Sequence, residues 1–212
     1  GKKLGVIGLG AIGQLVANAA ISLGMEVYGY DPYLSVNAAW NLSSEVKHIV
    51  NVEDIYKECD YITIHVPSNE ETKGFMNEEA FALMKDGVRI LNFARGDLVN
   101  NEDLLVNVAS GKISKYISDF AAPELIGREN IIILPHLGAS TPESEDNCAK
   151  MAVNEIKEYL ENGNIINSVN FPGVNQARVS KVRLCIINKN VPNILASISK
   201  LFADYNLNIE NM

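Results

Sequence analysis

Apolar residues follow a repeating order along the first two-thirds of the chain, in which short segments rich in apolar residues alternate with stretches of helical spacing. The short segments predict buried strands over residues 4–7, 27–30, 61–66, 88–93, 116–119 and 131–134. Helices are predicted between them over residues 12–23, 52–58, 77–87 and 101–110. Such alternation is typical of a parallel sheet with helices on both faces. The pattern therefore predicts an α/β fold with a doubly wound parallel sheet of the Rossmann type.

A glycine-rich turn lies between the first strand and the first helix. It reads Gly8-Leu9-Gly10-Ala11-Ile12-Gly13, and the inward face of the helix after it is predicted to hold Ile12, Val16, Ala19, Ala20 and Leu23. In such a turn the first glycine permits the sharp bend and the second lets backbone N–H groups approach a pyrophosphate. The third lets the helix pack closely on the strand. Because a helix N-terminus also favours an anion, we expect a dinucleotide at Gly8, Gly10, Ala11, Ile12 and Gly13.

Asp31, at the end of the second strand, indicates which dinucleotide is bound. Its carboxylate can accept hydrogen bonds from the ribose hydroxyls of NAD and would repel the additional phosphate of NADP. Residues 32–35 offer no arginine or lysine to receive that phosphate. NAD is therefore the expected cofactor. The simpler interpretation is that Asp31 only opens a turn before Pro32.

The last third of the chain begins with a long predicted helix. Either Ser140 caps it in a capping box with Glu143, or Thr141 caps it with Pro142 at the first helical position. Gly163 ends the helix, whose apolar stripe is Ala149, Ala152, Val153, Ile156 and Leu160. A short strand over residues 165–169 and a linker over residues 171–176 follow.

A second module is predicted to start after the linker. A strand over residues 182–187 precedes a helix over residues 192–203, and another strand begins at residues 207–209. The helix is expected to turn Ile194, Leu195, Ile198, Leu201 and Phe202 inward. We thus predict an NAD-binding domain over residues 1–140, a crossover helix with return segment and linker over 141–176, and a truncated α+β module over 177–212.

Composition and charge exclude several classes of partner. The formal net charge of −8 argues against a nucleic-acid or anionic-membrane surface, since both require clustered cations. The chain holds no run near the roughly 20 apolar residues of a membrane span and no signal-peptide pattern. Cys59, Cys148 and Cys185 lack metal-ligand spacing, and the histidines are scattered. We therefore expect reduced thiols, no metal and a cytoplasmic protein.

Three polar residues follow the last three predicted strands of the sheet. Arg95, Glu124 and His136 all fall beyond carboxyl ends, which is where ligands of open α/β sheets bind. An imidazole can accept the proton of a substrate hydroxyl near neutral pH, and a guanidinium matches a carboxylate in two hydrogen bonds. Taken singly, each residue also has a simpler interpretation: a loop histidine with one backbone bond, a solvated arginine and an exposed loop acid.

These residues carry a resemblance to a known family. The segment from Gly8 to Thr141, with Phe93-Ala94-Arg95-Gly96 and Pro135-His136-Leu137-Gly138-Ala139-Ser140-Thr141, resembles the NAD-dependent D-2-hydroxyacid dehydrogenases. The resemblance implies that His136 is the acid/base, that Glu124 pairs with its ring and that Arg95 holds the substrate. It also implies that Asp119 lies near the nicotinamide carboxamide, with Val66, Pro67, Ala94 and Gly138 along the cofactor groove.

The tail resembles the start of an ACT regulatory domain. The resemblance is carried by Pro192-Asn193-Ile194-Leu195-Ala196, with Asn193 where a glycine is usual. It implies an amino-acid effector at Asn190 and Asn208, although both asparagines are equally explained as caps of a helix and a strand.

The family also implies a homo-oligomer and a substrate domain whose larger part precedes the NAD-binding domain. We therefore expect this chain to bind NAD without full turnover. The alternatives are a dehydrogenase of another 2-hydroxy acid and a non-catalytic regulator that senses NAD or an amino acid.

Overall fold

The computed structural model describes residues 1–212, with the side chain of Asn37 excepted. The chain divides into two compact units, Gly1–His136 and Leu137–Met212. Each unit is described by itself.

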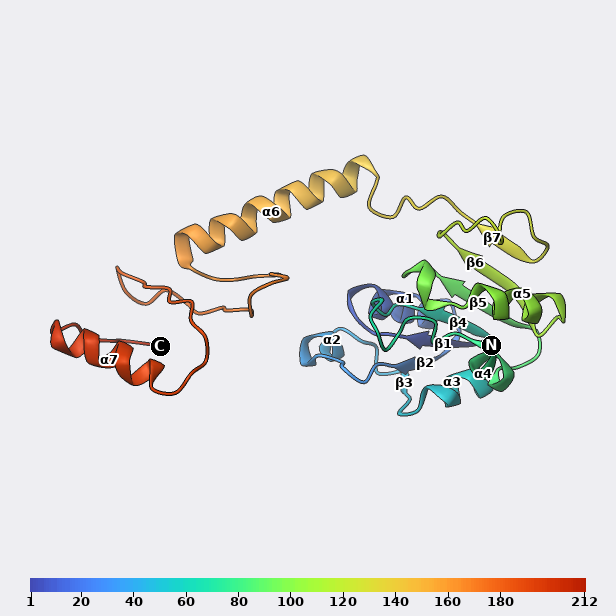
Figure 1. Cartoon of the computed structure of the whole chain (residues 1–212), viewed down its shortest axis with the longest axis horizontal. Coiled ribbons are helices and arrows are strands. Elements are labelled where there is room, and N and C mark those ends of the chain that lie inside the picture. The colour runs from blue at the N-terminus through green and yellow to red at the C-terminus, as the bar shows by residue number, and fades with distance from the viewer. The chain divides into compact units, whose positions relative to one another are not determined.

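The first unit is built on a seven-stranded parallel sheet in the order β3-β2-β1-β4-β5-β6-β7 (Figure 1). Its strands are β1 (Lys3–Ile7), β2 (Glu26–Tyr30), β3 (Lys47–His48), β4 (Tyr61–Ile64), β5 (Val88–Asn92), β6 (Ile113–Ser118) and β7 (Ile131–Ile133). All six predicted strands of this unit are present, so the predicted doubly wound sheet is confirmed. The two-residue edge strand β3 was not predicted from the sequence, because Lys47 and His48 lack an apolar run.

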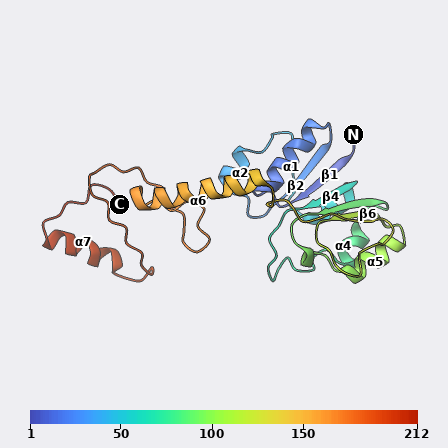
Figure 2. The same cartoon turned by 90° about the horizontal axis from the view of Figure 1, so that it is seen from above.

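Helices cover both faces of this sheet (Figures 1 and 2). One face packs against α3 (Val52–Glu58), α4 (Glu78–Leu83) and α5 (Asn101–Ala109), which share a single apolar core with the central strands. The other face packs against α1 (Ala11–Ser22) in a second core. The short helix α2 (Val36–Trp40) and the 3₁₀ turn Gly96–Leu98 complete the unit. Since β1 pairs with both β2 and β4, the chain reverses its winding direction at β1, and ligands bind beside such a reversal.

The buried face of α1 agrees with the predicted one only in part. Ala20 is buried and Val16 packs against the core as expected, whereas Ile12 and Leu23 are 64% and 80% exposed. Gly13 and Ala17 are buried without having been predicted. Small side chains let the helix axis approach the sheet closely, and close approach is the reason for a glycine at the third position of the turn. The large apolar residues are consequently displaced from the contact.

Asparagines precede three helices of this unit, and two of them cap the helix through their side chains. The Asn77 side chain accepts from the N–H of Ala80 at the start of α4. Asn51 precedes α3 without a side-chain cap bond, and Asn100 caps α5 by accepting from Glu102 and Asp103. Each cap satisfies N–H groups that a helix start leaves without a partner.

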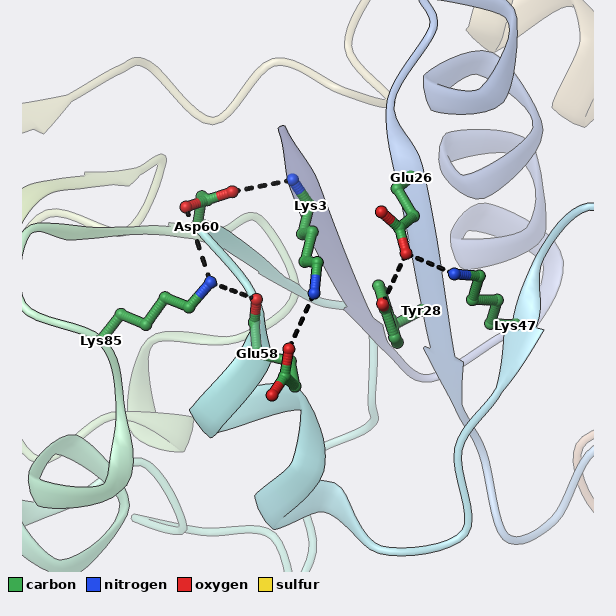
Figure 3. Close-up of polar contacts among 7 residues, drawn as sticks. All are labelled: Lys3, Glu26, Tyr28, Lys47, Glu58, Asp60 and Lys85. Carbon is green, nitrogen blue, oxygen red and sulfur yellow. Dashed lines mark hydrogen bonds and ion pairs between the residues drawn. The ribbon is translucent and has the colours of Figure 1, made fainter. Parts of the chain in front are cut away.

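An ionic cluster joins the amino-terminal ends of the strands, at the edge opposite the glycine turn (Figure 3). Lys3 Nζ donates to Glu58 at 2.7 Å, and Glu26 accepts from Lys47 and from the Tyr28 hydroxyl. The hydrogen bond from Lys47 holds the pKa of Glu26 at about 2, and Lys3 similarly lowers the pKa of Glu58. The remaining members are Asp60, which accepts from the Lys3 backbone N–H, and Lys85.

The second unit contains α6 (Pro142–Asn162) and α7 (Ile194–Asp204). Of the two predicted caps of α6, the structure forms the one at Thr141, whose hydroxyl accepts from the N–H of Ser144. Gly163 ends α6 at φ 71°, as expected for a left-handed C-cap. Neither helix has a buried residue, and the predicted apolar stripe of α6 is exposed. Of the residues expected to turn inward on α7, Leu195 and Leu201 are exposed, and the other three are only partly buried.

The strands predicted for the second unit are wrong for this structure. Across residues 137–212 the described backbone forms a single β-bridge, between Ile165 and Val174. Residues 182–187 and 207–209 are not strands. A strand needs a neighbour to accept its backbone hydrogen bonds, and a lone pair of strands is only marginally stable in water. None of the helices among the described residues is long and apolar enough to cross a membrane.

Candidate active site

The glycine turn leaves open space only where a ligand is expected. Gly8 has φ +91°, and a Cβ there would lie 2.6 Å from the His65 carbonyl oxygen. A Cβ on Gly13 would collide with the Gly8 carbonyl oxygen. Gly10 has no atom within 4 Å of the position of its Cβ. Gly8 and Gly13 are thus required by the fold, whereas Gly10 borders free space.

The N-terminus of α1 faces this free space with unpaired N–H groups. Gly10 is the N-cap and makes no side-chain cap bond, and the first turn contains no acidic residue. A pyrophosphate at this position would accept hydrogen bonds from the N–H groups of Ala11, Ile12 and Gly13, and the helix dipole would stabilise its charge.

Asp31 connects the turn to the end of β2. One of its carboxylate oxygens accepts from the Leu9 N–H at 2.8 Å and the other from the Tyr33 N–H at 2.9 Å. The second bond is the turn-opening interaction that the simpler interpretation predicts. The first holds the glycine turn, and each carboxylate oxygen keeps further lone pairs for ribose hydroxyls. Asp31 therefore fits both interpretations at once.

The expected groove residues follow the neighbouring strands β4 and β5. Val66 and Ala94 are partly buried against the core, and Pro67 is exposed beside Val66. His65, just before them, contacts the Thr63 hydroxyl through Nε2 at 3.0 Å, and burial lowers its pKa. These residues all lie beyond the carboxyl ends of their strands.

Arg95 lies in the turn after β5. Its backbone is extended, and its exposed guanidinium donates from Nη1 to the Ala94 carbonyl oxygen at 2.6 Å. The next residue, Gly96, is packed so closely that an added Cβ would lie 3.1 Å from the Phe120 Cβ. The turns after β5 and β6 are therefore in direct contact.

His136 has a carboxylate partner, which is Asp119. The ring nitrogen Nδ1 lies 2.9 Å from Asp119 Oδ2, and the Asp119 side chain is only 13% exposed. The imidazole also packs against Phe120, with ring centroids 4.8 Å apart. Ser118 and Ile133 are paired in register on β6 and β7, so the loops that follow begin side by side. This pairing brings Asp119 and His136 together.

Glu124 contacts a different residue from the one expected. Its carboxylate accepts from Asn101 Nδ2 at 2.7 Å. Hydrogen bonds from its own backbone N–H and from Asn101 lower its pKa. The expected pair of Glu124 with His136 is thus not formed in the described structure, where the carboxylate beside the imidazole is that of Asp119, one residue after β6.

One polar atom beneath this site lacks a partner. Asp119 Oδ1 is buried and has no hydrogen-bond partner among the described residues. Such an atom is costly unless a donor reaches it. The nicotinamide carboxamide offers an N–H₂ group, so the orphaned oxygen, the open space at Gly10 and the free N–H groups of α1 together fit NAD.

Several residues of the site were missed by sequence reasoning. The Arg95 turn is held by Asn92, which is bonded in turn to Tyr116. Phe120 packs against His136, and Asn101 donates to Glu124. Asn92 had one usable signal, since an amide at the end of the predicted buried strand, directly after Ile90 and Leu91, is unusual. The others resemble ordinary core or loop residues in the sequence.

The remaining predicted ligand residues belong to the second unit. Gly138 follows the boundary at His136, and Asn190 and Asn208 are exposed. Among the described residues no group of three or more His, Cys, Asp or Glu could hold a metal ion.

Comparison with known proteins assigns the first unit. Residues 1–138 match the NAD-binding domain of the D-isomer-specific 2-hydroxyacid dehydrogenases. D-3-phosphoglycerate dehydrogenase of Haemophilus influenzae is 34% identical over 99% of this chain and 53% of its own length. The chain thus spans about half the length of the curated relatives it matches.

Solved structures agree with this assignment. A glyoxylate reductase from Paecilomyes thermophila matches with a TM-score of 0.70 and 28% identity, covering 80% of this chain and 52% of that one. D-lactate dehydrogenase from Aquifex aeolicus, complexed with NAD and lactic acid, matches with a TM-score of 0.63 and 30% identity. The match covers 76% of this chain and 54% of that one. The chain belongs to the D-isomer-specific 2-hydroxyacid dehydrogenase family, through its NAD-binding domain.

Proposed function

We propose that this chain provides the NAD-binding half of a D-3-phosphoglycerate dehydrogenase, which oxidises 3-phosphoglycerate to 3-phosphohydroxypyruvate in the first step of L-serine biosynthesis. The observation that carries the proposal is the imidazole of His136 beside the buried carboxylate of Asp119, 2.9 Å away, at the ligand-binding edge of an NAD-binding sheet.

Oxidation of a hydroxyl to a ketone requires a base at the oxygen while hydride leaves the carbon. Because Nδ1 of His136 donates to Asp119, Nε2 keeps a lone pair and can accept the hydroxyl proton. Asp119 thereby selects the tautomer and orients the ring. Bound NAD supplies the hydride acceptor.

Arg95 is proposed to hold the substrate carboxylate. The guanidinium has five N–H donors in a planar fork, which match the two oxygens of a carboxylate. Its exposed position leaves donors available besides the one given to the Ala94 carbonyl. Glu124 is proposed as a second acidic group of the site, which the resemblance assigns to the His136 ring.

The choice of 3-phosphoglycerate rests on two supports. The first is the name of the Haemophilus influenzae relative, whose match extends over nearly all of this chain. The second is the ACT-like tail, which suits feedback by an end product and makes L-serine the proposed effector, at Asn190 and Asn208. We also propose a cytoplasmic homo-oligomer, and the free thiols of Cys59, Cys148 and Cys185 are consistent with a reducing compartment.

Asn193 supports the comparison of the tail with an ACT domain. It has φ 66° at the start of α7, a left-handed conformation that glycine and asparagine tolerate best. A glycine is usual at this position, and an asparagine can meet the same backbone requirement.

Two alternatives remain in competition. Solved relatives include dehydrogenases of lactate and mandelate, so another D-2-hydroxy acid is one alternative substrate. A non-catalytic regulator that senses NAD or an amino acid is the other alternative.

The test is a calorimetric titration of this chain with NAD and with NADP, joined to an activity assay with 3-phosphoglycerate on the same sample. We expect NAD to bind more tightly than NADP. Turnover of lactate or glycerate in preference to 3-phosphoglycerate would favour the first alternative. If a full-length form turns over equally well with His136→Asn, the assignment of His136 is wrong. Absence of NAD binding in a folded sample would contradict the cofactor site.

A further inference from the structure

Asn92 places a buried amide directly beneath the turn that carries Arg95. It is the last residue of β5 and is fully buried. Its Oδ1 accepts from the Ala94 N–H at 3.2 Å, and its Nδ2 donates to the Arg95 carbonyl oxygen at 2.8 Å. One side chain therefore binds the backbone on both sides of the peptide bond between Ala94 and Arg95.

Tyr116 holds this amide from the neighbouring strand. Its hydroxyl accepts from Asn92 Nδ2 at 3.2 Å, and the residue is 1% exposed. Burial raises the pKa of the Tyr116 hydroxyl, so the group stays neutral. Asn92 can then rotate only by giving up hydrogen bonds in a site that water does not reach.

Two of the three side-chain hydrogen bonds of Asn92 join it to the backbone of the Arg95 turn, and the third joins it to the Tyr116 hydroxyl. None of them extends the sheet, whose ladder at this point is made by the backbone of β4, β5 and β6. On its other side the turn is confined by the contact of Gly96 with Phe120. The backbone of the Arg95 turn is thus held by the Asn92 amide and by the contact with Phe120, while the guanidinium remains exposed.

We propose that Asn92, held by Tyr116, is a positioning residue for Arg95. This inference rests on the proposed function for the role of Arg95 in binding substrate, and it deepens that proposal. The guanidinium of Arg95 is attached to a backbone that Asn92 keeps rigid, so less conformational freedom is lost when a carboxylate binds.

The test measures backbone order in this chain by nuclear magnetic resonance. In Asn92→Asp the acceptor for Ala94 remains, but both donated bonds are lost and a carboxylate oxygen faces the Arg95 carbonyl. We expect the order parameters of the Ala94, Arg95 and Gly96 amides to fall from about 0.85 to below about 0.6. The amides of β1 and β4 should be unaffected.

Tyr116→Phe provides a second variant in case Asn92→Asp fails to fold. It removes one hydroxyl and leaves the ring in the core, so the order of the Arg95 turn should fall by a smaller amount. Ser114→Ala is the matched control, because it removes a hydroxyl of β6 that bonds the Gly87 carbonyl at the opposite end of the strand. Unchanged order at the Arg95 turn in the folded variants, or an equal loss throughout the sheet, would overturn the inference.

Binding and turnover separate this inference from the proposed function. NAD affinity should fall by less than kcat/KM in both variants, since neither residue contacts the glycine turn and only Ala94 of the perturbed turn lies along the expected cofactor groove. In a turnover-competent form, Arg95→Lys and Asn92→Asp should each lower kcat/KM, and the double variant should lose less than the product of the two effects. If Arg95→Lys alone has no effect, the proposed role of Arg95 is wrong, while the order parameters still decide whether Asn92 rigidifies the turn.

Discussion

Gly10→Ala should separate the requirements of the ligand from those of the fold. Gly10 has φ −66° and ψ −162°, an extended conformation open to alanine, and its Cβ would meet no atom within 4 Å. Replacing a glycine in such a conformation stabilises by about 0.4–1 kcal/mol through the unfolded state. Alanine is a poorer N-cap than glycine, which costs about the same amount. We therefore expect the free energy of unfolding to change by less than about 1 kcal/mol.

Binding of NAD should respond very differently. The added methyl group would occupy the space through which the pyrophosphate approaches the N–H groups of α1, so we expect at least a tenfold loss of affinity, or about 1.4 kcal/mol. Calorimetric titration with NAD gives the affinity, and urea unfolding followed by circular dichroism gives the stability.

Gly13→Ala is the matched comparison for this variant. Its Cβ would collide with the Gly8 carbonyl oxygen, so the fold itself should lose about 1–3 kcal/mol along with NAD binding. A Gly10→Ala protein that folds normally and binds NAD as tightly as the unchanged chain would refute the assignment of the glycine turn to the pyrophosphate.

Three further predictions concern catalysis, packing and the ionic cluster. His136→Asn should lower turnover of a full-length form by about 10²–10⁴-fold and leave NAD affinity within about twofold in calorimetry. A loss of NAD affinity as large as the loss of turnover would argue against a purely catalytic role. Gly5→Ala would push a Cβ into Ile55 of α3, so urea unfolding should show a loss of about 1–3 kcal/mol, and unchanged stability would mean that α3 packs less closely on β1. The pKa of Glu26 is lowered from 4.5 to about 2 in the folded state, so its contribution to stability is present above about pH 4.5 and is lost as the pH falls toward 2. The urea midpoint should fall over this range by less in high salt and by less in Lys47→Met, and an equal fall in all three cases would exclude the cluster as its cause.

The order of strands and helices in the first unit followed from the sequence, except for β3 and α2, which were not predicted. Each buried strand of a doubly wound sheet is a continuous apolar run, and the runs ending at Ile7, Tyr30 and Ile64 are marked off by glycine, Asp31 and Pro67. The glycine turn could also be predicted from the sequence, because the spacing of its glycines is set by local backbone geometry. Local rules were only partly successful for the buried face of α1, because burial of Gly13 and Ala17 in place of Ile12 and Leu23 depends on how closely the helix approaches the sheet.

The second unit shows the limit of such local rules. Residues 182–187 have the apolar character of a strand, yet the described residues provide no strand to pair with them. The helices α6 and α7 formed where they were predicted, because their hydrogen bonds are internal. Strand pairing is a tertiary property and cannot be inferred from the strand alone.

The sequence by itself determined the sheet, the glycine turn, and the presence of Arg95 and His136 beyond the carboxyl ends of their strands. Only the tertiary structure decided that Asp119 is the partner of His136 and that Asn92 and Tyr116 hold the turn of Arg95. Strand positions follow from the hydrophobic pattern of each segment. The partner of a polar side chain depends on which loops the register of neighbouring strands brings together, and no single segment carries that information.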